Sequence, residues 1–546
     1  MKDQFIPMLF TSMKSYSKKQ FVTDLVAGII VAIIALPLSI ALAIASGVGP
    51  EQGLYTAIVA GFLISFFGGS TVQIAGPTAA FATIVAGIVA KNGTDGLAVA
   101  TIIAGILLII MGVTRLGGLI KYIPYTITTG FTAGIAVTIA IVQLKDFCGV
   151  TYAPGMAPIE TMEKLMCFSE SIGTFNLAAF AVGMVCLLIV FIWPKINKMI
   201  PGSIIAIIVA VIMVKGLKLQ VNTIGDLYTI SNSLPKFRLP SGISFGMVKQ
   251  MFPDAATIAI LAAIESLLSA LVADGMVNSK HRSNQELIAQ GIGNTASALF
   301  GGIPATGAIA RTAANIKNGG RTPIAGIVHA VTLVLILVIL MPYAAWIPMP
   351  CIAAILFNVA WNMCQIKPFT RICKTAPKSD IIVLVVTFIL TVVFDLVVAI
   401  EWGMIIACLL FIKRMSEETD IRSWKYDENL EDDLRPVPKQ IRVYEVTGPL
   451  FFGMTDQIAD SIKSKDFTKV LVIRMRAVPA VDTSALKSLE ELHDKMAKRG
   501  IKMVFSHVNE QPMKAMEKAG FIDKVGRENF QPHIDAALDY AEMISK

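Results

Sequence analysis

The sequence predicts an all-α membrane domain followed by a small α/β domain. Hydrophobic residues make up 55% of the 546 residues and charged residues only 16%, a balance typical of integral membrane proteins. Apolar runs of membrane length recur from Asp24 to Lys413, and the charge density then rises sharply. We therefore expect four segments: an N-terminal segment 1–23, a transmembrane domain 24–413, a charged linker 414–436 and an α/β domain 437–546.

About 14 membrane spans can be counted, since roughly 20 apolar residues cross the ~30 Å apolar layer of a bilayer. They fall into two sets of seven: 24–46, 53–69, 72–90, 97–114, 124–144, 176–194 and 201–218, then 251–272, 286–300, 303–317, 323–341, 350–363, 380–398 and 402–413. The third span of each set is interrupted by Gly and Pro. Because each set has an odd number of spans, the second set must enter the membrane from the opposite side, which predicts a 7+7 inverted repeat.

Basic residues concentrate in the parts of the chain that this scheme places on one side of the membrane: Lys14, Lys18, Lys19, Arg115, Lys121, Lys195, Lys198, Lys280, Arg282, Lys317, Arg321, Lys367, Arg371, Lys374 and Lys378. By the positive-inside rule this side is the cytoplasm, and both chain ends lie there. The long connections 146–175 and 219–250 then lie outside. We expect a multi-pass protein of the plasma membrane, whose net charge of +8 needs no nucleic-acid partner.

The interrupted span of the second set contains an arginine. Gly301, Gly302, Pro304 and Gly307 argue against regular helix before position 308, and Arg311 follows about one turn inside the helix that begins there. Non-helical backbone survives at membrane depth only where protein buries it or where it lines a cavity. The helix start and the arginine would together favour an anion. The alternative is an arginine that reaches an interface or binds neighbouring carbonyl groups.

The interrupted span of the first set has a similar pattern. In residues 72–84, Gly76 and Pro77 lie inside the apolar run and Thr78 follows them, which is typical of extended backbone that enters a helix. The two half-helices are then expected to point toward each other near the middle of the bilayer. A pair of kinked helices with no ligand between them is the alternative.

Glu265 is the other charged residue near the middle of a span. A carboxylate there is costly unless it is protonated, paired with a cation or paired with an arginine. A proton-coupled transporter needs such a group, and Ser269, one helical turn along, could supply a ligand for a cation. A static pair between Glu265 and Arg311 that holds two helices together is the alternative, and the two interpretations are compatible.

Enzyme motifs are missing from the sequence. It contains no phosphate-binding loop, nucleophile elbow or kinase signature, and its seven cysteines include no CxxC pair. We therefore expect neither an enzyme nor a resident cofactor nor a metal site. His329 stands alone in an apolar span and is interpreted as a packed or hydrogen-bonded residue rather than a proton relay.

The C-terminal segment alternates between strand-like and helical patterns. Strands are expected at 441–448, 469–478 and 501–508, and helices at 482–499, 510–519 and 532–545. Asp482, Thr483 and Ser484 lie where a strand turns into the longest of these helices. An N-cap explains Asp482, and a phosphorylatable or ligand-sensing loop is the alternative.

Four stretches together resemble the SulP family of sulfate-permease-type anion transporters, with a C-terminal part similar to a STAS domain. They are LPLSIALAIASGVGPEQGLYTAIVAGFLISFFGGSTVQIAGPTAAF (36–81), AIESLLSALVADG (263–275), GGIPATGAIARTAANIKNGGRTPIAGIVHA (301–330) and VDTSALKSL (481–489). The resemblance implies a core and a gate domain, a substrate site between the third and tenth spans, and a homodimer with contacts through the STAS domain. That domain would also be the part that binds a cytoplasmic protein partner.

The resemblance also implies roles for individual residues. The substrate would be lined by Gln73, Ala75, Gly76 and Thr78 on one side and by Ala308, Ile309, Ala310 and Arg311 on the other. Glu265, with Ser269 one turn along, matches the acidic position linked in relatives to a coupling H⁺ or Na⁺. Asp482, Thr483 and Ser484 match the loop that is phosphorylated in the STAS relatives of sigma-factor regulators.

One departure from the family pattern concerns the substrate. Sulfate-carrying relatives often have Gln and Tyr after the proline of the first span, where this chain has Leu38 and Leu42 after Pro37. An apolar first span offers fewer hydrogen-bond donors to a doubly charged anion. Bicarbonate or a small carboxylate such as fumarate is therefore a candidate substrate as well as sulfate. Glu rather than Asp at position 265 favours H⁺ over Na⁺.

Three functions fit the sequence. The first is a secondary transporter that moves a small anion by alternating access with proton symport. The second is an uncoupled anion exchanger or channel. The third is a membrane sensor whose STAS domain recruits a cytoplasmic partner. Nucleobase transporters share the expected architecture, but the STAS-like tail and Arg311 argue against them.

Overall fold

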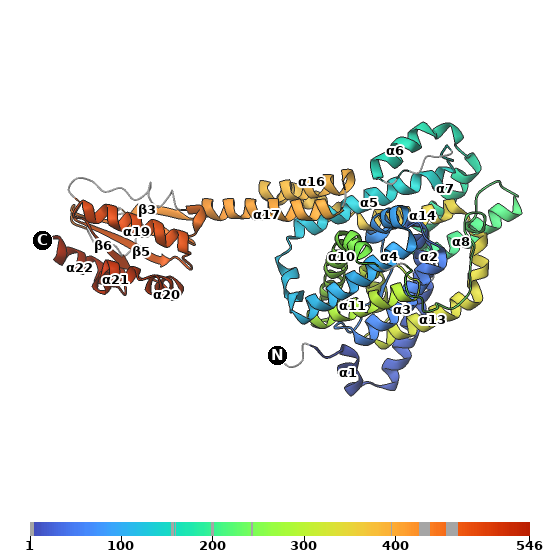
Figure 1. Ribbon diagram of the computed structural model, residues 1–546, viewed down its shortest axis with the longest axis horizontal. Coiled ribbons are helices and arrows are strands. Elements are labelled where there is room, and N and C mark those ends of the chain that lie inside the picture. The colour runs from blue at the N-terminus through green and yellow to red at the C-terminus, as the bar shows by residue number, and fades with distance from the viewer. Residues whose placement is uncertain are drawn as a thin grey trace. The chain divides into compact units, whose positions relative to one another are not determined.

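The computed structural model describes residues 5–153, 158, 160–197, 201–241, 244–394, 396–424, 437–454 and 468–546. The chain divides into two compact units, Met1–Met404 and Ile405–Lys546, and the border falls inside helix α17 (Leu396–Glu418). The first unit is mostly helical and the second contains a five-stranded sheet (Figure 1). The predicted fold class, a helical membrane part followed by a small α/β domain, is thus confirmed.

The helices of the membrane unit follow the predicted spans closely. They are α1 (Met8–Ser12), α2 (Lys18–Ala45), α3 (Pro50–Phe67), α4 (Ala82–Val113), α5 (Tyr125–Cys148), α6 (Thr161–Glu170), α7 (Leu177–Ile196), α8 (Gly202–Gly216), α9 (Ile224–Leu227), α10 (Phe245–Val277), α11 (Ser283–Leu299), α12 (Ile309–Lys317), α13 (Ile324–Leu340), α14 (Met349–Met363), α15 (Ile366–Thr375) and α16 (Lys378–Val393). Within the described ranges, seven helical stretches are long and apolar enough to cross a membrane. The count of 14 spans stays a prediction.

Two groups of helices make up this unit. Helices α2, α3, α4, α10, α11, α12 and α13 pack against one another, and we refer to them as the core group. Helices α5, α7, α8, α14 and α16 form a second set, the flanking group. The two groups meet where α2 packs against α14 and α8, and where α4 approaches α5. The division corresponds to the core and gate domains that the resemblance implies.

A single element, α4, contains two predicted spans. The expected spans 72–90 and 97–114 are joined, and the helix is interrupted at Gly93, whose φ of 66° and ψ of −174° are not helical. A residue with a Cβ atom is disfavoured in that conformation. Gly93 therefore marks the kink at which the first of these two spans ends and the second begins.

Small residues at four-residue spacing bring α3 close to its neighbours. Gly53, Ala57, Gly61 and Ser65 lie on one face of this helix. A Cβ atom at Gly53 would overlap the carbonyl oxygen of Ser39 in α2, and one at Gly61 would lie 3.2 Å from the carbonyl oxygen of residue 75. Small residues allow this backbone approach, as they do in other membrane helices.

A buried aspartate ties the start of α2 to the loop before α13. One carboxylate oxygen of Asp24 accepts a hydrogen bond from the backbone N–H of Arg321 (2.8 Å), and the other accepts one from the hydroxyl of Thr322 (2.6 Å). The hydroxyl of Tyr16 also donates to this carboxylate at 3.1 Å. Burial and the nearby carboxylate raise the pKa of Tyr16 to about 12. Asp24, noted in the sequence only as the opening of a span, is thus a structural residue.

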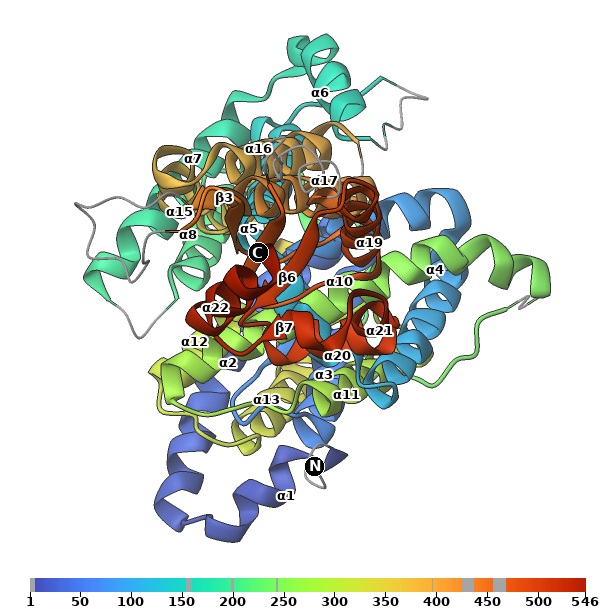
Figure 2. The same ribbon diagram turned by 90° about the vertical axis from the view of Figure 1, so that its left-hand side faces the viewer.

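The second unit is a sheet covered by helices on both faces (Figures 1 and 2). Its strand order is β3 (Asp420–Trp424), β4 (Ile441–Thr447), β5 (Val470–Ala477), β6 (Lys502–Ser506) and β7 (Phe530–Gln531). The β3–β4 pair is antiparallel and the other pairs are parallel. Alternate residues of the strands face two separate apolar clusters. One lies under α19 (Thr483–Lys498), α20 (Glu510–Lys518) and α21 (Phe521–Val525), the other under α22 (Ile534–Ser545).

Candidate functional site

The two interrupted spans meet as a pair of short strands. β1 (Ala75–Gly76) runs antiparallel to β2 (Thr306–Gly307), with Ala75 opposite Gly307 and Gly76 opposite Thr306. Each glycine leaves room for a neighbouring side chain. A Cβ atom at Gly76 would clash with the guanidinium of Arg311, and one at Gly307 would clash with the side chain of Gln73. The strand pair therefore fixes where the two following helices begin.

Each strand leads into a helix whose N-terminus has no side-chain cap. After β1, a 3₁₀ turn (Ala79–Phe81) continues into α4, and after β2 the helix α12 begins at Ile309. Uncapped N–H groups and the positive end of the helix dipole favour an anion at such positions. The structure thus contains the two half-helices that the glycine and proline pattern predicts.

The predicted substrate residues differ in exposure. Gln73, Ala75, Gly76 and Arg311 are buried in the protein, Thr78 and Ala308 are half-buried, and Ile309 and Ala310 are exposed. The residues with accessible surface are therefore those of the two helix starts. A ligand held at these starts would contact backbone and hydroxyl groups before it reached the arginine.

Arg311 is only 3% exposed. Its Nη2 donates to the carbonyl oxygen of Pro77 at 3.0 Å, whereas its Nη1 has no hydrogen-bond partner among the described residues. The alternative considered from the sequence was an arginine that binds neighbouring carbonyl groups. Among the described residues, only one of its two terminal nitrogens does so. A buried guanidinium nitrogen without a partner is costly. The free nitrogen is available to an anion, which would supply the missing charge.

Glu265 in α10 contacts both interrupted spans. Its Oε2 accepts a hydrogen bond from the hydroxyl of Thr306 in β2 at 3.1 Å, and Thr78 beyond β1 faces the same carboxyl group. The ion pairs among the described residues include none between Glu265 and Arg311. The static pair considered from the sequence is therefore not formed directly.

Two serines of α10 contact β2 and α12. The hydroxyl of Ser269 lies 3.5 Å from that of Thr312, and the hydroxyl of Ser266 accepts from the backbone N–H of Gly307 at 3.0 Å. Ser269 thus turns toward α12. Ser266 was missed in the sequence, although it follows Glu265 directly.

A buried carboxylate that sequence reasoning missed supports the approach to β1. Glu286 in α11 accepts from the backbone N–H groups of Gly69 (2.8 Å) and Ser70 (3.2 Å). It also accepts from the side-chain amides of Gln73 (2.9 Å) and Gln290 (2.9 Å). The amide nitrogen of Gln73 is therefore engaged away from the helix starts, and this residue acts as a support for β1.

The same helix supports β2. The side-chain oxygen of Asn294 accepts from the backbone N–H of Ala305 at 2.8 Å, and its nitrogen donates to the carbonyl oxygen of that residue at 2.9 Å. Glu286, Gln290 and Asn294 follow one another at four-residue spacing, so they form one polar stripe on α11. Three polar residues at four-residue spacing inside an apolar span were the sequence signal that could have revealed the hydrogen bonds that support β1 and β2.

His329 is fully buried in α13, as its interpretation as a packed residue requires. Neither ring nitrogen has a hydrogen-bond partner in the described part of the chain. Its interpretation as packed rather than hydrogen-bonded is therefore the one that fits.

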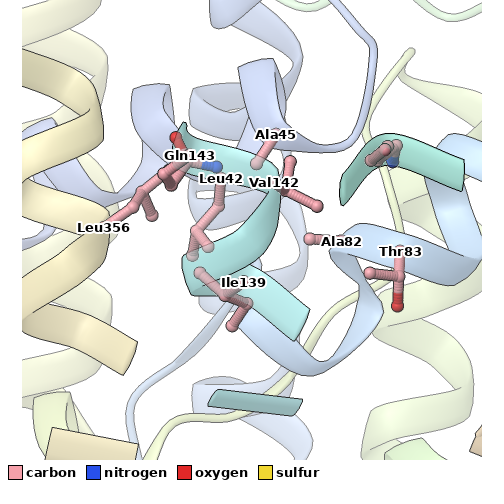
Figure 3. A pocket seen from close by; sticks show the side chains of 9 residues that line it. Leu42, Ala45, Ala82, Thr83, Ile139, Val142, Gln143 and Leu356 are labelled. Atoms are coloured by element: carbon pink, nitrogen blue, oxygen red, sulfur yellow. The ribbon is translucent and has the colours of Figure 1, made fainter. Parts of the chain in front are cut away.

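A narrow cavity lies beside the start of α4, between the core group and the flanking group (Figure 3). The space in it that the centre of a water molecule can occupy is only about 10 Å³. The lining residues are Leu42, Ala45, Ala82, Thr83, Ile139, Val142, Gln143, Lys164 and Leu356. Leu42, whose apolar character was the departure noted from the sequence, is thus a wall residue. It supplies no hydrogen bond to a ligand there.

In the second unit, Asp482 caps α19 as expected. One of its oxygens accepts from the backbone N–H of Ala485 at 2.8 Å and the other from that of Phe452 at 2.9 Å. Thr483 and Ser484 are exposed beside it. A regulatory role for these three residues stays a prediction.

Comparison with known proteins agrees with this architecture. Residues 21–387 match the Sulfate permease family, and residues 435–537 match the STAS domain. The chain is 39% identical to the putative sulfate transporter YvdB of Bacillus subtilis (strain 168), over 96% of this chain and 98% of that protein. It is 32% identical to the bicarbonate transporter BicA of Picosynechococcus sp., over 86% and 85%.

Two solved structures are similar. The transmembrane domain of a cyanobacterial bicarbonate transporter BicA has a TM-score of 0.63 at 29% identity, over 70% of this chain and 98% of that chain. The structure of SLC26A9 has a TM-score of 0.88 at 17% identity, over 99% and 93%. At that identity the second likeness concerns the fold alone.

Proposed function

Because the chain belongs to the sulfate permease family, we propose that it is a secondary transporter of a small inorganic anion of the sulfate or bicarbonate type. The observation that carries this proposal is the buried Nη1 of Arg311, which has no hydrogen-bond partner in the described part of the chain and lies behind two uncapped helix starts. An anion at the helix starts would receive positive dipole ends from two directions and a full charge from the arginine. The names of the relatives, which are sulfate and bicarbonate transporters, support the same class of substrate.

We further propose that transport is coupled to a proton through Glu265. This carboxyl group contacts threonines from both interrupted spans, so its charge acts on the region between the helix starts. A carboxylate there repels an incoming anion, and protonation removes the repulsion. By linkage, proton and anion then raise each other's affinity, as symport requires.

Sodium is the less favoured coupling ion. The oxygen groups that face Glu265 are the hydroxyls of two threonines, and Ser269 turns toward α12. These are few ligands for a sodium ion. A proton needs only the carboxylate itself, and the transport cycle then requires no resident cofactor.

Alternating access would proceed by movement between the two helix groups. The strand pair, the arginine and the carboxylate all belong to the core group, whereas the flanking group forms the opposite wall of the cavity. A shift of one group against the other would expose the helix starts to each side in turn.

Transport into proteoliposomes tests the function and the coupling together. Labelled sulfate, bicarbonate and fumarate are each offered with and without an inward H⁺ or Na⁺ gradient. The proposal predicts that one anion accumulates only with the proton gradient. Equal flux of several anions regardless of gradient would instead identify an uncoupled exchanger or channel, and accumulation of fumarate alone would identify a small-dicarboxylate transporter.

We also propose a plasma-membrane location with both chain ends in the cytoplasm, a homodimer and a protein partner for the STAS domain. The third function, a sensor, is separated from transport by deletion of the C-terminal unit. Because β3 belongs to its sheet, the deletion must begin at residue 420 rather than at 437. A transporter should retain flux after this deletion, whereas a sensor should lose its output while it still binds the anion.

A further inference from the structure

A lysine from outside the predicted spans reaches the cavity beside the start of α4. Of the nine lining residues, Lys164 alone is charged, and Thr83 and Gln143 are the other polar ones. Lys164 comes from α6, a short helix in the connection between α5 and α7. The remaining six side chains are apolar, so among the described residues the lysine is the one full charge in the lining of this cavity.

The chain holds α6 in place by several contacts. Its first turn has a capping box in which Glu160 and Glu163 each bind the other's backbone N–H. The hydroxyl of Tyr152 donates to the carbonyl oxygen of Lys164 at 3.4 Å, and the ammonium of Lys145 lies 4.8 Å from the centre of the same tyrosine ring. These contacts join α6 to the end of α5.

The two ends of the connection are also joined to each other. The hydroxyl of Thr174 accepts from the backbone N–H of Thr151 at 2.9 Å, and the backbone N–H of Asn176 donates to the carbonyl oxygen of Cys148 at 3.0 Å. The end of α5 and the start of α7 are thereby held side by side. The fold therefore holds the backbone of the connection that carries Lys164 beside the cavity.

The environment of Lys164 favours a negatively charged ligand. The side chain is half-buried. Burial lowers the pKa of its ammonium below the ordinary value for lysine, and the neighbouring Glu163 offsets part of this. An ammonium that has lost part of its hydration is stabilised by an anion placed beside it.

The cavity also connects the lysine to the candidate site. Ala82 is the first residue of α4, so the cavity borders this helix directly after the 3₁₀ turn Ala79–Phe81, whose start carries the uncapped N–H groups (Figure 3). In this structure it is too narrow to hold more than about one water molecule. Passage of an anion along it therefore requires its walls, which come from both helix groups, to separate.

We propose that Lys164 is an anion-binding residue of the access route on the α6 side of the membrane, where it holds the incoming anion before the anion reaches the start of α4. This proposal rests on the proposed function. If it is correct, Lys164 contributes to the affinity for anions that arrive from the α6 side and does not affect the affinity for anions that arrive from the other side. The predicted topology places that side outside the cell.

The experiment compares transport from the two sides. Right-side-out and inside-out membrane vesicles are prepared from cells that express the wild type, Lys164→Gln, Lys164→Arg or Lys215→Gln. Labelled bicarbonate and labelled sulfate are the probes. Lys215 is the matched control: its ammonium lies 3.0 Å from the centre of the Trp346 ring, and it is absent from the lining of the cavity. Lys215 lies in the last turn of α8. The chain just after this helix is joined to the start of α7, because the side chain of Asn176 donates to the carbonyl oxygen of Gln220.

The expected result is a change in KM from one side. Lys164→Gln should raise the KM by about tenfold to one-hundredfold in right-side-out vesicles, the size of one hydrogen bond to a charged group, with kcat within about twofold. The KM in inside-out vesicles should stay unchanged, Lys164→Arg should restore most of the affinity, and Lys215→Gln should behave as the wild type. Added salt should raise the KM of the wild type more steeply than that of Lys164→Gln.

Other outcomes are equally decisive. A KM that rises only in inside-out vesicles would support the lysine's role and reverse the predicted orientation of the chain. An unchanged KM on both sides, or an equal loss of kcat on both sides that arginine does not restore, would overturn the proposal. If the wild type transports neither probe, the proposed function fails; the lysine is then judged by calorimetric binding of the same anions to the purified protein. Lys164→Gln must weaken that binding for the proposal to stand.

Discussion

Replacement of Glu265 by Gln separates proton coupling from anion binding. Glutamine has the same shape and keeps an oxygen that can accept the 3.1 Å hydrogen bond from Thr306, so the strand pair should stay in place. The variant cannot take up a proton. Any effect on transport then follows from the lost charge change rather than from lost packing.

The size of the effect follows from the energy in a pH gradient. One pH unit is worth about 1.4 kcal/mol per proton, so a transporter that carries one proton per anion can accumulate the anion about tenfold at zero membrane potential. Glu265→Gln should reduce this ratio to about one, while exchange of labelled anion across the membrane continues. Anion affinity should be retained or increased, because the repelling carboxylate is gone.

The assay measures accumulation in proteoliposomes clamped at zero potential, with an inward gradient of one pH unit. Glu51→Gln, in the first turn of α3, makes the same chemical change in the same unit and should retain accumulation like that of the wild type. If Glu265→Gln still accumulates the anion about tenfold, the carboxyl group is structural and the coupling hypothesis is wrong. If it binds no anion at all, the residue belongs to the anion site itself.

Three further predictions follow from contacts at the two candidate sites. In the wild type, one guanidinium nitrogen of Arg311 binds the carbonyl oxygen of Pro77 and the other has no partner among the described residues. Arg311→Lys removes this planar pair of nitrogens, so the KM for the anion should rise at least tenfold in the uptake assay. Gly76→Ala should displace the guanidinium and abolish uptake, whereas Gly118→Ala, where a Cβ meets open space, should not. Asp482→Ala should destabilise residues 420–546 by about 1 kcal/mol in denaturant unfolding, since an N-cap is lost, and an unchanged midpoint would contradict that role.

The interrupted spans could be predicted from the sequence because their signals are local. Gly76, Pro77 and Gly307 disfavour helix wherever they occur, and an arginine inside an apolar run is visible without any fold. The half-helices and Arg311 were therefore found. That their backbones pair as β1 and β2 was not, because the register depends on residues more than 200 positions apart.

The supporting network could not be predicted for the same reason. Glu286 and Gln73 are 213 positions apart, and each alone looks like an isolated polar residue in an apolar span. In the C-terminal part, β3 was missed because its sequence, DIRSW, is mostly polar and lacks the apolar alternation of a buried strand. It lies at the edge of the sheet, where backbone pairing with β4 is enough to hold it.

The distribution of polar groups between the two helix groups bears on how such a transporter could move. Arg311, Glu265 and the network around Glu286 all lie within the core group, and their hydrogen bonds join core elements to one another. The flanking group contributes mostly apolar residues to the cavity, with Gln143 as its polar exception. An apolar surface can slide without leaving hydrogen bonds unpaired, whereas the core network cannot be separated without that cost. The proposed motion should therefore carry the core group, with the anion, as one rigid body past the flanking helices.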